Sequence, residues 1–198
     1  MASTYYWYAW VVFVIIAFFL NAKSSNKNAL LLFVLIQMIM ITNYIEGQRP
    51  FWISFFIQSL FGVYLWAESR SIFQHLWPIL FTCCWSIYQL FLLSNPVWYL
   101  FPGVQLSTLL LVGIIYYLGF SLNSQLGLWI LMNSFGVITS YTVSHVLYLD
   151  FMPDFIEFHI TLFKGMMAIF TINGIAYVKK VSRRVKRKKK GMPKVSSL

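Results

Sequence analysis

The chain has 198 residues, of which 60% are hydrophobic and 10% are charged, and its formal net charge is +10. Soluble domains carry about a quarter charged residues, so this composition excludes a water-soluble globular protein. Ten of the fifteen Lys and Arg residues lie between Lys179 and Lys194, so the remainder is a neutral, apolar body.

Seven apolar segments follow one another along this body, separated by short stretches that carry charges or helix breakers. A membrane-spanning helix needs roughly 17–25 mostly apolar residues, and within the membrane each backbone polar group must be satisfied inside its helix. We therefore predict an all-α polytopic integral membrane protein, with residues 1–178 forming a bundle of seven transmembrane helices. The predicted spans are Tyr5–Leu20, Ala29–Tyr44, Phe51–Ala67, Ile72–Leu93, Gly103–Leu122, Leu126–Leu147 and Phe155–Val178.

The orientation follows from the basic run KKVSRRVKRKKK, which begins directly after Val178. Lys and Arg accumulate in cytoplasmic segments, so the C-terminus is predicted to be cytoplasmic and, with seven spans, the N-terminus lies outside. Residues 179–198 are predicted to form a flexible basic tail that binds anionic lipid headgroups or an acidic partner. The cations expected to bind are Lys179, Lys180, Arg183, Arg184, Lys186, Arg187, Lys188, Lys189 and Lys190.

The last predicted span carries charged side chains, which are costly inside a membrane and often functional. Glu157, Thr161 and Lys164 share one helical face with Ala168 and Thr171, and we expect this face to point into the bundle. Two interpretations stay open. Glu157 and Lys164 either form a proton or ion site, or Lys164 is a satisfied contact between helices while Glu157 suits the positive helix start.

Two histidines, His145 and His159, flank the acids Asp150, Asp154 and Glu157 near this helix start. His145 and His159 are added to the candidate intramembrane polar site, with His159 on the face opposite Lys164. The five side chains match no recognised metal-ligand spacing, so we predict no metal site. The adjacent Cys83 and Cys84 are expected to be membrane-buried apolar residues without a redox role.

The sixth predicted span carries a stripe of small residues, Gly136, Ser140 and Ser144, each four positions apart. Such stripes let helix backbones approach closely, so we predict that this one is a helix-packing surface.

The aromatic start YYWYAW, the very short connections and the segment SNPVWYLFP resemble the YphA-like family of small multi-pass membrane proteins in Gram-positive spore formers. The resemblance covers nearly the whole chain. It implies a location in the bacterial cytoplasmic membrane, and it transfers no catalytic residue.

No nucleophile or metal motif of the GxSxG or HExxH kind is present, so we predict a non-enzymatic protein without a cofactor. The leading hypothesis is a scaffold or accessory subunit, whose partners are membrane lipids and a membrane protein or a second copy, but not nucleic acid. The alternative is a small secondary transporter or proton pathway centred on Glu157 and Lys164.

Overall fold

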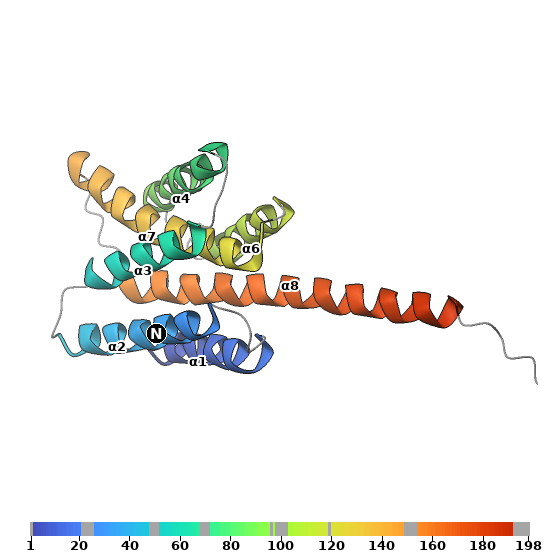
Figure 1. The fold of residues 1–198 in the computed structure, drawn as a ribbon. Coiled ribbons are helices and arrows are strands. Elements are labelled where there is room, and N and C mark those ends of the chain that lie inside the picture. The colour runs from blue at the N-terminus through green and yellow to red at the C-terminus, as the bar shows by residue number, and fades with distance from the viewer. Residues whose placement is uncertain are drawn as a thin grey trace, which may run out of the picture.

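The structure is a computed structural model that describes residues 2–20, 26–47, 52–67, 72–95, 97, 103–118, 120–148 and 154–191. Within these residues it is all-helical, as the sequence predicts, with seven α-helices and one 3₁₀ helix (Figure 1). The elements are α1 (Ala2–Phe19), α2 (Lys27–Ile45), α3 (Trp52–Trp66), η1 (Ile72–His75), α4 (Leu76–Ser94), α6 (Gly103–Tyr117), α7 (Leu122–Val146) and α8 (Phe155–Gly191).

Four of the described helices, α1, α2, α7 and α8, are long and apolar enough to cross a membrane by length and composition. The apolar parts of α3, α4 and α6 are shorter. A helix of 15 residues such as α3 rises about 22 Å, which is less than the roughly 30 Å of hydrocarbon in a bilayer. The evidence that helices of this protein cross a membrane therefore comes mainly from the four long helices.

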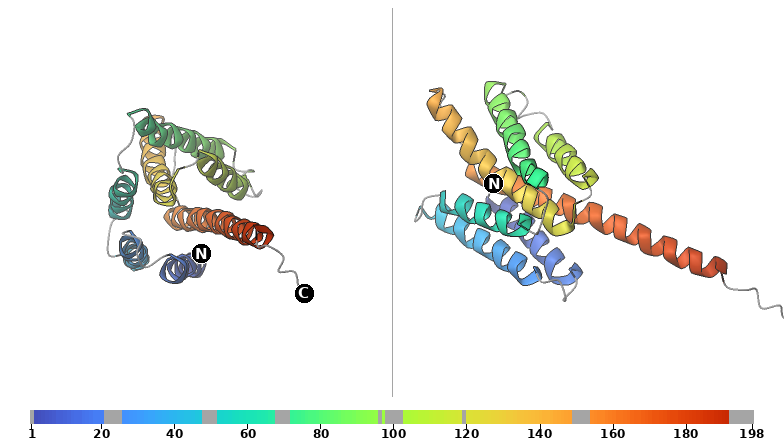
Figure 2. Two further views of the ribbon diagram at one scale, coloured as in Figure 1. Left: turned by 45° about the vertical axis from the view of Figure 1, so that its right-hand side comes forward. Right: turned by 45° about the horizontal axis from the view of Figure 1, so that its top comes forward.

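Helix α7 is the centre of the bundle. It packs most extensively against α3 and α4, and it also contacts α6 and α8 (Figure 2). Every residue from Ser124 to Ser134 is buried. A Cβ built on Gly127 would lie 2.9 Å from the Trp66 backbone nitrogen and 3.0 Å from the Gly62 carbonyl oxygen, so α3 and α7 touch through their backbones here.

Side-chain contacts identify the two ends of the bundle. At one end, Tyr6 bonds to Thr42, and Phe155 lies against Tyr44 and Trp52. At the other end, Lys27 Nζ donates to the carbonyls of Ala17 and Leu20, and Trp66 packs on Phe120. Helices α1, α2, α3, α7 and α8 therefore alternate in direction. The chain starts at the first end, which we call the N-terminal end, and α8 leaves the bundle at the other, which we call the tail end.

Two helix boundaries differ from the prediction. The residues Asn123–Gln125 were expected to separate two spans, but they form the first turn of α7. Their polar groups are satisfied there, because the Gln125 amide donates to the Phe120 carbonyl and the Ser124 hydroxyl pairs with Ser121. The turn before α7 therefore starts several residues earlier than the polarity of the sequence indicates.

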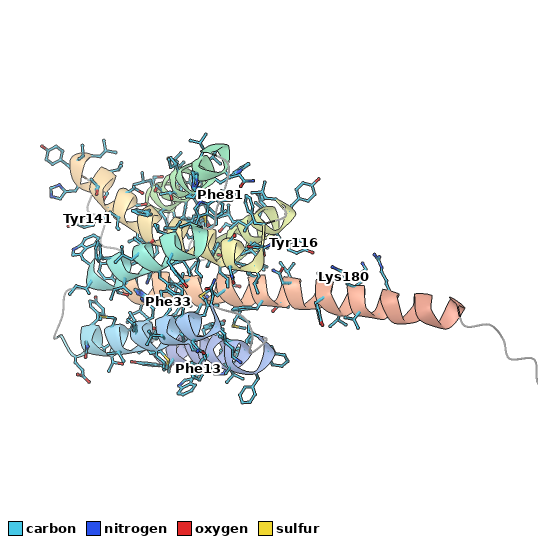
Figure 3. The ribbon with its side chains drawn as sticks, viewed as in Figure 1. Phe13, Phe33, Phe81, Tyr116, Tyr141 and Lys180 are labelled. Atoms are coloured by element: carbon cyan, nitrogen blue, oxygen red, sulfur yellow. The ribbon has the colours of Figure 1, made fainter. Side chains whose placement is uncertain are left out.

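The second difference concerns the end of the last helix, which was expected near Val178. Helix α8 instead continues without a break through the basic run to Gly191 (Figure 1). Lys and Arg are good helix formers, and no Gly or Pro interrupts the sequence between Val178 and Gly191. Figure 3 shows Lys180 on the part of α8 that extends past the other helices. Residues 192–198 lie outside the described residues.

Candidate functional site

The start of α8 is fixed by Asp154, which precedes the first helical residue. Its Oδ1 atom accepts hydrogen bonds from the backbone amides of Ile156 and Glu157, at 3.0 and 3.2 Å. An aspartate in this position satisfies amides that have no partner within the helix. The cap sets where α8 begins, and thereby sets the depth at which His159 enters the bundle.

His159 is the centre of a buried polar cluster, which consists of Gln37 from α2, Ser54 and Gln58 from α3, and His159 from α8. None of the four residues is more than 4% exposed. His159 Nε2 lies 2.7 Å from Ser54 Oγ and 2.9 Å from Gln58 Nε2. Gln37 Oε1 accepts from the same two groups, at 2.7 and 3.0 Å. Three helices that are distant in sequence are thus joined by side-chain hydrogen bonds.

The hydrogen bonds define the tautomer of His159. Its Nδ1 atom lies 2.7 Å from the Phe155 carbonyl oxygen, which can only accept, so Nδ1 carries the proton. In the neutral ring Nε2 is then an acceptor. The Gln58 amide supplies two protons, one to His159 and one to Gln37, and the Ser54 hydroxyl donates to one of the same two acceptors. A neutral imidazole is therefore consistent with all of these hydrogen bonds.

Helix α1 closes the cluster with Tyr5, whose ring meets the His159 ring edge-on at a centroid distance of 6.2 Å. Two buried polar atoms here have no hydrogen-bond partner, the Tyr5 hydroxyl and Gln37 Nε2. A buried polar group without a partner costs about 1–3 kcal/mol. The cluster therefore retains spare hydrogen-bonding capacity next to His159.

Glu157 and Lys164 lie on the other side of α8, next to α1. The Lys164 ammonium is 3.9 Å from Glu157 Oε1, and it lies 5.6 Å from the centre of the Tyr8 ring. The side chains reach each other across two helical turns, although they remain 25% and 36% exposed. Lys164 thus has both an acidic partner and an aromatic face.

The face of α8 that carries Glu157, Thr161 and Lys164 was expected to point into the bundle, and the structure corrects this expectation. Thr161 is buried, but Glu157 and Lys164 are half-buried and Thr171 is exposed. The most deeply buried polar side chain described in α8 is His159, at 1% exposed, on the opposite face, which meets α2 and α3. The sequence indicated His159, but its partners Ser54 and Gln58 lie more than a hundred residues away, and no local pattern connects them.

His145 does not join this site. It is exposed in the last turn of α7, where its ring lies 6.4 Å from that of Tyr141. Asp150 lies outside the described residues. Among the residues that the structure describes, no group of three or more His, Cys, Asp or Glu side chains could hold a metal ion. Cys83 and Cys84 are exposed on the surface of the bundle, where they can face lipid, and their burial in the membrane stays a prediction.

The small-residue stripe of α7 is buried at Gly136, Ser140 and Ser144. Its role differs in detail from a close approach of backbones, because the indole of Trp85 from α4 fills the space above Gly136. The Ser86 hydroxyl pairs with Thr139 and also approaches the Gly136 carbonyl. Backbone approach occurs at Gly62 and Gly127 instead, two isolated glycines that form no sequence motif.

The basic residues divide into two groups. Lys179, Lys180 and Arg183 are exposed on the part of α8 beyond the bundle. The side chains of Arg184, Lys186, Arg187, Lys188, Lys189 and Lys190 lie outside the described residues, although their backbone is helical.

Comparison with known families matches residues 2–194 to the YphA-like integral membrane proteins. The chain belongs to this family. The match covers almost the whole sequence and confirms the resemblance seen in the aromatic start and short connections. No curated protein and no solved structure matches the chain.

In this YphA-like protein, the polar cluster has the chemistry of a neutral hydrogen-bonded junction. Ser54 against His159 is also the pairing of a nucleophile with its base. Here, however, the Gln58 amide donates to the same imidazole nitrogen, and all four side chains are buried. The arrangement holds helices together, and His159 Nε2 is the one basic nitrogen in the cluster.

Proposed function

We propose that this protein is a non-enzymatic membrane scaffold, which holds a basic helix at the cytoplasmic face of a bacterial cell membrane. The observation that carries the proposal is the continuity of α8, which runs as one helix from the buried His159 cluster into the basic segment. A rigid connection of this kind presents charge at a fixed place and direction. The proposed partners are anionic or acidic, and the proposed bundle crosses the membrane seven times.

The orientation within this proposal rests on charge and on the ends of the bundle. With the tail end in the cytoplasm, the predicted spans assign the connections with Lys23, Lys27 and Arg70 to that side and the connection with Arg49 alone to the outside. The start of α1 and the projecting part of α8 lie at opposite ends of the bundle, which supports an odd number of crossings.

The experiment replaces the nine cations between Lys179 and Lys190 by Gln in the full chain. Protein neighbours are then trapped by photo-crosslinking in bacterial cells. Loss of the crosslinked species is expected, while a control variant, Lys27→Gln, retains them because its charge lies within the bundle. Unchanged crosslinks would reduce the basic segment to a signal that stops membrane insertion.

The buried polar cluster favours a second candidate, a proton or ion pathway. Intramembrane polar clusters often line such pathways, and the spare Gln37 and Tyr5 groups lie beside His159. In proteoliposomes loaded with a pH-sensitive dye, this function requires proton or ion flux above that of protein-free vesicles. Both His159→Gln and Lys164→Met should then abolish the flux in folded protein. Flux equal to the protein-free value would eliminate the pathway.

A further inference from the structure

The basic part of α8 carries a row of three valines among its Lys and Arg residues, which we call the apolar seam. Val178 and Val181 are exposed, and Val185 follows four residues later, so the three residues stand at positions i, i+3 and i+7. Residues at this spacing share one side of a helix. The seam is the pattern by which one helix docks against another.

Beyond the bundle this seam has no covering element in the described residues. The last side-chain bond between α8 and another helix joins Asn173 to Gln125 of α7, at 2.7 Å. After it, Ile175, Tyr177 and Val178 are exposed, and so are the residues up to Arg183. The projecting helix is free on its whole circumference wherever its side chains are described (Figure 1).

Lipid headgroups are a poor match for most of these cations. From Val178 to Gly191 the helix rises about 20 Å. Attraction to an anionic lipid surface fades within a Debye length, about 8 Å at physiological salt. In the proposed orientation α8 continues past the bundle without a break, so only the first turn or so of the basic segment lies within this range. A helix lying flat on the surface would instead place all its cations and valines against lipid.

Charge also argues against the other occupants. A second copy would bring the same cations against this seam, and like charges at such close range repel. Nucleic acid would use the cations through its phosphates but would leave the valines without a role. An acidic helix with its own apolar seam satisfies both features at once.

We infer that the projecting part of α8 docks an acidic amphipathic helix of a cytoplasmic partner protein, with Val178, Val181 and Val185 as the apolar seam and the flanking Lys and Arg as the charge contacts. The inference rests on the proposed scaffold function and names its partner class. It also makes the length of the helix functional, because the docking surface must stand clear of the headgroups.

Two variants of the full chain, reconstituted in phosphatidylcholine nanodiscs, separate the seam from the charge. The seam variant carries Val181→Ser and Val185→Ser, which keeps every charge and changes helix propensity little. The charge variant carries Arg184→Gln, Lys188→Gln and Lys189→Gln, the cations that flank the seam by helical spacing, and it keeps every valine. The probe is a synthetic heptad peptide with Leu at its a and d positions and Glu at e and g.

Both variants should bind the peptide at least about tenfold more weakly than the unaltered protein, and only the charge variant should lose salt dependence. Vesicles containing phosphatidylglycerol and a DNA duplex serve as competitors, and neither should distinguish the seam variant from the unaltered protein. If only the charge variant binds more weakly, the seam is no contact and the inference fails while the scaffold proposal stands. If neither variant differs from the unaltered protein, the inference fails, and the crosslinking experiment alone decides the scaffold proposal.

Discussion

Gly165 is a single residue whose replacement should disrupt the bundle. It lies in α8 against Trp129 of α7, and a Cβ built on it would overlap the indole ring. Trp129 is fully buried and donates to the Leu162 carbonyl at 2.9 Å, so the ring cannot move without losing this bond. Overpacking costs about 1–3 kcal/mol, and a lost hydrogen bond about 1 more. Gly165→Ala should therefore destabilise the protein by about 2–4 kcal/mol, measured by unfolding in detergent micelles.

Gly174 in the same helix gives a matched control, because a Cβ there would meet nothing within 4 Å. Gly174→Ala should be neutral or stabilising by up to about 1 kcal/mol, since alanine is the better helix former. Equal effects at the two positions would mean that Trp129 does not pack on Gly165.

At the residue scale the sequence predicted which side chains were unusual more reliably than what they contact. Glu157, Lys164 and His159 all stand out because polar groups are rare in apolar segments. The direct approach of Glu157 and Lys164 depends on side-chain reach, and the choice of buried face depends on where α2 and α3 lie. Neither the contact nor the choice of buried face can be predicted from the neighbouring residues in the sequence. Gly165 likewise looks ordinary until Trp129 is placed beside it.

At the scale of elements, hydropathy located the helices well and their ends less well. Apolar residues report where lipid lies, whereas a helix ends where its backbone meets a breaker or a turn. Helix α2 ends beside Gly47, which adopts a positive φ of 71°, and this boundary agrees with the sequence to within a few residues. Helix α8 has no such breaker at Val178, so it continues into the basic run.

The continuity of α8 can be measured directly. In a chain with Cys83→Ala and Cys84→Ala, spin labels at Thr171→Cys and Lys188→Cys should be separated by about 26 Å plus the reach of the labels. Double electron–electron resonance in nanodiscs should give one narrow distance distribution. The substitution Ser182→Pro should broaden this distance distribution, because proline breaks the helix between the two labels. A broad distribution in the parent chain would favour the flexible tail expected from the sequence.

At the scale of the whole molecule, the arrangement centres on α7, although the sequence drew more attention to the last helix. Burial on nearly all sides of α7 requires neighbours around it, and these are supplied by α3, α4, α6 and α8. The charged helix α8 can then lie at the side of this core, where Glu157 and Lys164 pair and Tyr8 covers the ammonium. Helices α1 and α2 complete the enclosure of the His159 cluster. This arrangement depends on packing between helices that are distant in sequence, and composition and residue spacing do not predict such packing.

The orientation of the bundle in the membrane gives the last prediction. The two ends defined by the Tyr6–Thr42 and Lys27–Ala17 contacts place residue 3 and residue 182 on opposite sides of the bundle. In cysteine-free chains, a membrane-impermeant maleimide should label Ser3→Cys in intact spheroplasts, and it should label Ser182→Cys only after permeabilisation. The basic residues explain why the tail end is expected in the cytoplasm, since Lys and Arg are retained on that side of the membrane. Labelling of both positions from one side would require an even number of crossings. Labelling of both positions in intact spheroplasts would also remove the cytoplasmic partner, because the basic helix would then lie outside the cell.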